Sequence, residues 1–231
     1  MIQATHQGLD GNDVSSAAWS ALDVTRLYIT EAEEASGHEE GDPDEANPLF
    51  HLPRGQSLQR MLSDDDFVTL REQIGVSYAE LSRLKPWVAF MLLGQSQVRF
   101  AEQSMNASLL ERARFRRLPV MFLETWEEQV SYLDAAITPA KLSIAIRDVP
   151  NMACRLTRRL EAFRAGDDAT FANDVVPGEP VVARIDRWFV RLREAIDSGQ
   201  HAFAAVGIGQ IVGPHGLLAR FAASGYQVRR L

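Results

Sequence analysis

Four polar side chains stand where predicted strands give way to turns: His6, Glu31, Glu124 and Gln210. Open α/β sheets place their ligand sites at the carboxyl ends of strands. Histidine and carboxylate groups at such an edge could hold a divalent metal ion, which lowers the pKa of its bound water toward neutrality. A nearby glutamate could carry the proton while the resulting hydroxide attacks a carbonyl group. These residue types therefore suit hydrolytic chemistry.

The two ends of the chain predict the strands that would position these side chains. Residues 201–206 form an apolar run of strand length, followed by the turn Gly207-Ile208-Gly209-Gln210 and a helix over residues 217–223. Two glycines let the backbone approach a ligand closely, and Gln210 is expected to point into the site. Residues 226–231 alternate like a closing strand. At the other end, residues 1–5 and 24–29 predict two strands around a helix that Ser15 or Ser16 could cap.

The middle of the chain has a helical pattern. Capping residues precede several apolar runs, among them Ser63 with Asp64 to Asp66, Thr125 with Glu128, and Thr138 with Pro139. The sequence therefore predicts one α/β domain over residues 1–231, with a small mixed β-sheet built from βαβ-like ends and a large helical middle. The expected parts are a sheet from about 1–31, 118–124 and 201–231, helices over about 57–117 and 125–197, and an acidic loop at 31–48.

Composition narrows the classes of partner. The net charge is −7, and eight acids without a basic residue lie between Glu31 and Glu45. This run predicts a solvated loop, and the overall acidity argues against a nucleic-acid partner. No apolar run is long enough to span a membrane, and the first residues carry no signal peptide, which favours the cytoplasm unless the true start lies upstream. The single cysteine, Cys154, is expected to be a small buried residue.

Several motifs together resemble the TraB/GumN proteins, the group that includes the Tiki metalloproteases. The C-terminal stretch keeps Gly207, then Gly213-Pro214 with Leu217-Leu218, then Gly225-Tyr226 with Val228. Residues 118–133 match the Pro-Val, Leu-Glu-Thr and Glu-Gln-x-x-x-Leu signature of that family, and Pro86-Trp87 matches a further pair. The resemblance covers most of the chain.

The resemblance implies a site and a reaction. His6 and the residue at 210 would face each other as ligands of a divalent metal ion, manganese or cobalt. Glu31 or Glu124 would act as the general base, and Arg184 would bind an anion or a developing oxyanion. The implied activity is hydrolysis of peptides.

Four positions depart from the family pattern: Gln3 replaces glycine, Asn106 aspartate, Ile185 asparagine and Gln210 histidine. The Gln210 amide is a poor replacement for imidazole toward transition metals, although His215 could substitute as a ligand. Two functions therefore remain open. One is a metal-dependent hydrolase with a degenerate site and weak or no activity, and the other is a non-catalytic relative that binds a peptide or partner protein in the retained pocket.

Overall fold

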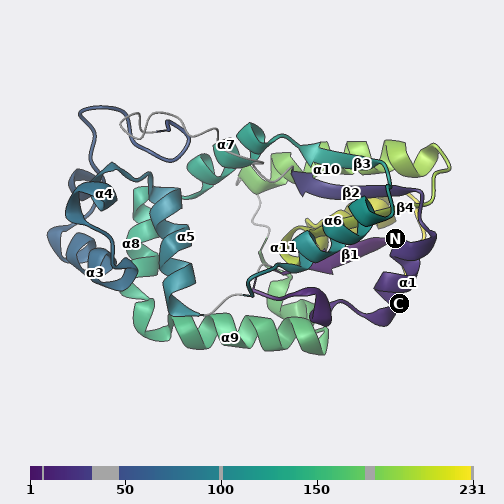
Figure 1. The fold of residues 1–231 in the computed structure, drawn as a ribbon, viewed down its shortest axis with the longest axis horizontal. Coiled ribbons are helices and arrows are strands. Elements are labelled where there is room, and N and C mark those ends of the chain that lie inside the picture. Colours follow the sequence, from purple (N-terminus) through teal and green to yellow (C-terminus); the bar gives the residue numbers. More distant parts are fainter. Residues whose placement is uncertain (7, 33–46, 99–100, 175–179, 230–231) are drawn as a thin grey trace. The chain divides into compact units, whose positions relative to one another are not determined.

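A computed structural model of the 231-residue chain describes residues 1–6, 8–32, 47–98, 101–174 and 180–229 (Figure 1). The chain divides into two compact units. The first comprises Met1–Glu33, Phe100–Thr125 and Arg159–Leu231, and the second comprises Glu34–Arg99 and Trp126–Arg158. Organisation as a single domain stays a prediction.

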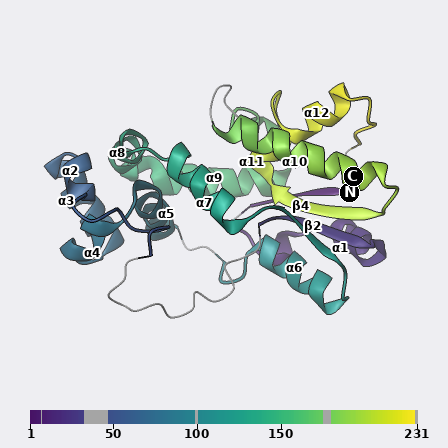
Figure 2. The ribbon, with the colours of Figure 1, turned by 90° about the horizontal axis from the view of Figure 1, so that it is seen from above.

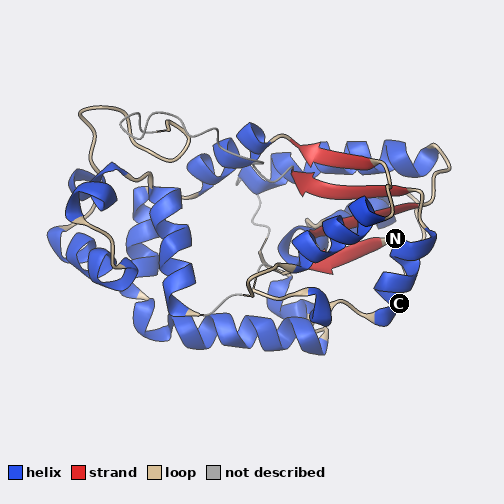
Figure 3. Ribbon diagram, in the orientation of Figure 1, coloured by secondary structure: helices blue, strands red, loops and turns tan. Residues whose placement is uncertain are grey.

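A four-stranded parallel sheet organises the first unit. The strands are β1 (Ile2–Thr5), β2 (Leu27–Ala32), β3 (Val120–Glu124) and β4 (Ala202–Gly207), in the order β1-β4-β2-β3. They are the red arrows of Figure 3. The helices of this unit are α1 (Ser16–Val24), α6 (Met105–Phe115), α10 (Pro180–Asp197), α11 (Ile208–Ile211) and α12 (Leu217–Ala223). The predicted α/β class is confirmed, with strands taken from both ends of the chain.

Helices cover both faces of this sheet, as Figure 2 shows, with α1 and α6 on one side and α10 and α12 on the other. On the α1 and α6 side, Tyr28 of β2 and Phe203 of β4 stack at 6.2 Å between ring centroids and pack against Leu22 and Leu109. The central residues of β2 and β4 are buried on both faces, as expected for parallel strands between helical layers.

Two details of the predicted sheet are wrong. All three strand pairings are parallel, so the described sheet is not mixed. The strands are parallel because helical crossovers connect them. The predicted closing strand is also missing from residues 226–229, while residues 230–231 lie outside the described part. Gly225 has a φ of 87°, and the Tyr226 amide donates to the Phe221 carbonyl at 3.1 Å. This is a Schellman-type ending of α12. Residues 226–229 line a groove with Met1 and Ala202 at the amino edge of the sheet but form no described strand pairing.

The second unit is helical in its described part. Its helices are α2 (Leu58–Met61), α3 (Asp64–Ile74), α4 (Tyr78–Arg83), α5 (Pro86–Gln97), α7 (Trp126–Ala136) and α8 (Pro139–Arg147), and α9 (Val149–Ala165) passes into the first unit after Arg158. The predicted caps are confirmed at Ser63 and Thr138, whose side chains accept backbone hydrogen bonds from Asp66 and Lys141. Cys154 is exposed on α9, so the expectation of a buried thiol is wrong.

The predicted acidic loop at 31–48 falls largely outside the described residues. Glu31 and Ala32 belong to β2, which extends beyond the expected end at Ile29. Residues 33–46 lie outside the described part. Within that part, no helix is long and apolar enough to cross a membrane.

Candidate functional site

The carboxyl edge of the sheet gathers the residues that the sequence singled out. His6 follows the last residue of β1, Gly207 ends β4, Glu31 is the penultimate residue of β2, and Glu124 ends β3. Because all four strands are parallel, these ends meet at one edge. Gln210 stands there too, within the short helix α11 that follows β4 directly.

A buried charge cluster occupies the β2 and β3 half of this edge. The Arg184 guanidinium, from α10, donates through Nε to both Glu124 oxygens at 3.1 and 2.9 Å and through Nη2 to Glu124 Oε1 at 2.6 Å. Nη2 also reaches Glu31 Oε2 at 3.2 Å. The side chains are 4%, 1% and 17% exposed for Arg184, Glu124 and Glu31. One arginine therefore joins both predicted bases.

Trp188 completes this cluster from the same helix. Its indole Nε1 donates to Glu124 Oε2 at 3.1 Å, and the Arg184 guanidinium carbon lies 4.0 Å from the centroid of its ring. Glu124 thus accepts hydrogen bonds at both oxygens from α10. Burying a charge this deeply requires such pairing, so the cluster fastens α10 to the ends of β2 and β3.

Gly207 lies where Glu31 and Gln210 converge. Its amide donates to Glu31 Oε1 at 2.6 Å. A Cβ at this position would lie 2.7 Å from Gln210 Oε1 and 3.1 Å from Glu31 Oε1. The missing side chain therefore lets two oxygens approach the end of β4, which explains the glycine at the head of the predicted turn.

His6 faces an aromatic environment. Its ring meets Phe163 and Phe171 edge-on, with centroids 5.9 and 6.1 Å apart, and its Nδ1 accepts a hydrogen bond from the Gly8 amide at 3.2 Å. Burial lowers the pKa of His6, the nearby charge of Arg159 lowers it further, and Asp174 opposes both. The neutral imidazole is therefore favoured, with its proton on Nε2.

Two further residues belong to the His6 half of the edge, and no sequence motif pointed to them. Arg159 of α9 donates to Asp174 through Nη1 at 3.2 Å and Nη2 at 2.5 Å, and its guanidinium lies 4.6 Å from the centroid of the Phe171 ring. A Cβ on Gly209 would lie 2.8 Å from Asp174 Oδ2, so this carboxylate rests on α11 next to Gln210. Arg159 lies on the same face of α9 as Met152, Leu156 and Phe163. An arginine within this apolar stripe is the sequence feature that could have identified Arg159 as a candidate site residue.

A family model described as TraB/PrgY/gumN matches residues 5–230, which is nearly the whole chain. The chain belongs to the TraB/PrgY/gumN family. A search of curated proteins and a search of solved structures each found no match. The resemblance stated from the motifs is thereby confirmed at the level of the family.

The positions that depart from the expected TraB/GumN pattern have structural environments of their own. Ile185 is fully buried on the apolar face of α10, and Gln3 donates through Nε2 to the Ala4 carbonyl at 2.8 Å. Asn106 Oδ1 is buried and has no hydrogen-bond partner among the described residues. Ile185 contributes to the core and cannot replace a polar contact.

The residues present at this edge fit a divalent metal ion poorly. Metal-bound histidines usually donate a hydrogen bond through the ring nitrogen that faces away from the metal. Nδ1 of His6 instead accepts one from Gly8, which leaves Nε2 protonated and unable to bind a metal in the neutral ring. Among the described residues, no group of three or more His, Cys, Asp or Glu side chains could hold a metal ion. His215, the alternative ligand, lies in the turn between α11 and α12.

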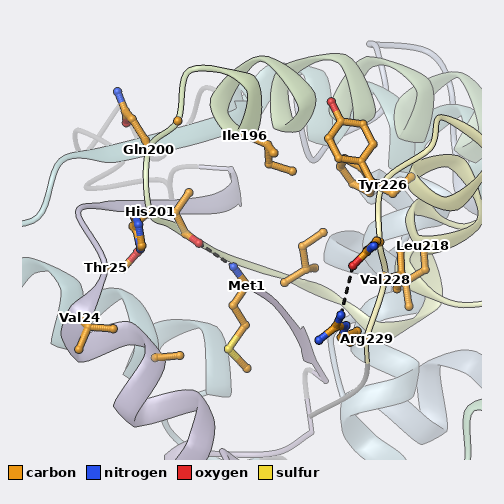
Figure 4. Close-up of a pocket in the computed structure, with 16 residues that line it drawn as sticks. Met1, Val24, Thr25, Ile196, Gln200, His201, Leu218, Tyr226, Val228 and Arg229 are labelled. Carbon is orange, nitrogen blue, oxygen red and sulfur yellow. Dashed lines mark hydrogen bonds between the residues drawn. The ribbon is translucent and has the colours of Figure 1, made fainter.

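A separate groove of about 630 Å³ lies at the amino edge of the same sheet. Figure 4 shows its lining, which includes Met1, Ile196, Leu218 and Val228. It contains none of the residues predicted for the site. This groove and the polar cluster of this family member therefore lie at opposite edges of the sheet.

Proposed function

We propose that this chain is a non-catalytic member of the TraB/PrgY/gumN family that binds a peptide or a segment of a partner protein at the carboxyl edge of its sheet. The observation that carries the proposal is the buried cluster of Arg184 with Glu124 and Glu31. A general base must reach the proton that it removes. Both predicted bases instead accept hydrogen bonds from Arg184, and Glu31 also accepts one from Gly207.

Arg184 is likewise held in hydrogen bonds within the cluster. It was expected to bind an anion, but it is 4% exposed and two carboxylates lie against it. A third carboxylate or an oxyanion would meet like charges there, and repulsion of that kind costs affinity. The cluster therefore supports an architectural role, while the His6 half of the edge supports binding.

The test is incubation of the purified chain with a pool of mixed-sequence peptides, with and without added manganese or cobalt, followed by mass spectrometry. Peptides should be retained and released intact under both conditions. Cleavage that requires added metal and disappears in His6→Ala would contradict the proposal.

The second candidate function is metal-dependent peptide hydrolysis with weak activity. Its support is the approach of the Gln210 and Glu31 oxygens beside Gly207, since amide and carboxylate oxygens suit hard cations. Calorimetric titration with manganese, cobalt and zinc distinguishes the two candidates.

We expect no binding by the native chain, and binding by Gln210→His would show that one imidazole at this position is the missing ligand. Gln200→His is the matched control, since it adds a histidine at an exposed position two residues before β4, at the opposite edge. Micromolar binding by the native chain that is lost in His6→Ala would favour the hydrolase instead.

A further inference from the structure

Arg159 is held in a fixed position at the His6 end of the sheet edge. Asp174 accepts hydrogen bonds from two of its nitrogens, and the Phe171 ring supports the flat face of the guanidinium. Asp174 is itself seated against Gly209. Two independent contacts thus restrict the guanidinium, and a restricted fork loses little conformational freedom when it binds a ligand.

The surroundings of Arg159 differ from those of Arg184 in charge and access. Arg159 is 28% exposed and Asp174 is 29% exposed. Asp174 is the one carboxylate that pairs with Arg159 among the described residues, whereas two pair with Arg184. A guanidinium carries five N–H donors, so a single carboxylate partner leaves donors for another anion. Arg159 is therefore the arginine at this edge that can serve a ligand.

The neighbours of Arg159 define what else the ligand would touch. The partly exposed rings of His6 and Phe163 form an aromatic wall near the guanidinium, while Phe171 is buried. Such a wall suits an apolar side chain, while the arginine fork suits a carboxylate in bidentate geometry.

We infer that Arg159 recognises a carboxylate of the bound peptide, with an adjacent apolar side chain packed against His6 and Phe163. The inference rests on the proposed peptide-binding function and names its specificity. The free C-terminal carboxylate and an acidic side chain offer the same chemistry, and the experiment distinguishes them.

The experiment presents mixed-sequence hexapeptides, N-acetylated throughout, to the native chain in three pools. One pool has a free C-terminal carboxylate, one has a C-terminal amide and no acid, and one has a C-terminal amide and a single glutamate. Affinity selection with mass spectrometry measures what is retained. At least one carboxylate-bearing pool should bind about tenfold or more tightly than the uncharged pool, as expected for a charge-assisted bidentate contact. The pool that is favoured identifies the source of the carboxylate.

Matched variants locate the contact. Arg159→Gln should remove the preference for a carboxylate, and Arg159→Lys should restore part of it, because a lysine keeps the charge without the fork. Arg164→Gln is the control, since Arg164 lies on the same helix, is 56% exposed and pairs through two nitrogens with Asp13. It should bind all pools as the native chain does. Circular dichroism checks that each variant is folded.

The possible failures are distinguishable. Equal retention of the three pools, or an unchanged preference in folded Arg159→Gln, overturns the role of Arg159 and leaves peptide binding intact. Retention of no pool by the native chain overturns the proposed function and this inference with it.

Discussion

The two halves of the sheet edge use arginine in opposite ways. In the β2 and β3 half, Arg184 is buried and joins Glu31 to Glu124. In the β1 and β4 half, Arg159 is partly exposed and pairs with Asp174. Each guanidinium also lies over an aromatic ring, Trp188 in the first half and Phe171 in the second.

The difference lies in what each arginine could still bind. Removing a charge from water is costly unless its partners satisfy it completely, so a fully buried arginine contributes to architecture. A half-exposed arginine with one partner costs less to keep and retains donors for a ligand. Arg184, to which the resemblance assigned a role, therefore holds the edge together, and Arg159, to which it assigned none, is the better candidate for recognition.

The largest expected effect is a difference in the free energy of unfolding between variants of the two arginines. Arg184→Gln should lower the free energy of unfolding by about 3–5 kcal/mol, because Glu124 would remain buried without its main partner. Arg159→Gln should cost less than about 1 kcal/mol, as for other partly exposed ion pairs. Urea denaturation of both variants measures the two losses. Equal losses would contradict the contrast between the halves.

A smaller effect comes from adding one methyl group beside each arginine cluster, at Gly207 next to the Glu31 carboxylate and at Gly209 next to the Asp174 carboxylate. In Gly207→Ala, the new Cβ would displace Gln210 and the Glu31 carboxylate, which Arg184 and the Gly207 amide hold in place. We expect a loss of about 1–2 kcal/mol, typical of overpacking. In Gly209→Ala, the three atoms nearest to the new Cβ all belong to the partly exposed Asp174 side chain, which can move, so stability should change by less than about 1 kcal/mol.

The same two variants should reverse their order in peptide binding. Gly209→Ala moves the partner of Arg159, whereas Gly207→Ala acts on the architectural half. Urea midpoints together with peptide retention check this pattern. A larger loss of binding in Gly207→Ala than in Gly209→Ala would argue that the ligand lies near Glu31.

The sequence could predict which residues meet at this edge, because strand ends and capping residues are local features. Ser63 and Thr138 cap helices as expected, and His6, Glu31 and Glu124 lie at or near the ends of their strands. It could not predict how the side chains pair. Helical spacing places Arg184 on the same apolar stripe as Val181, Ile185 and Trp188, which are buried. Its pairing with Glu124 and Glu31 depends on which face α10 turns toward the sheet, and the sequence does not show this.

The Arg159 to Asp174 pair was harder to foresee. It joins two segments fifteen positions apart through a turn and a short 3-10 helix at Asp168–Phe171, and no periodicity sets the distance between them. The prediction of a closing strand was wrong for a comparable reason. Alternation over residues 226–231 satisfied a strand pattern, while Gly225 with its positive φ directed the chain elsewhere.

The smallest expected effect is the pH dependence of stability that comes from His6, in the Arg159 half. Its pKa is lowered first by burial and then by Arg159. The unfolded chain, with an ordinary histidine pKa near 6.5, therefore binds more protons than the folded chain as the pH falls below neutrality. The contribution of His6 to stability should fall as the pH falls, by at most about 1.4 kcal/mol per pH unit. His6→Phe keeps the aromatic packing and should remove this part of the pH dependence.

Nuclear magnetic resonance titration of the His6 ring measures how the charges of neighbouring residues change the pKa of His6. Arg159→Gln should raise the pKa of His6, because a nearby positive charge is lost, and Asp174→Asn should lower it further, because the opposing negative charge is lost. Arg184→Gln should change it less than either, since Arg184 does not contribute to the lowered pKa. A shift in Arg184→Gln as large as that in Arg159→Gln would show that the two halves are electrostatically one site, and the separation of architecture from recognition would then be wrong.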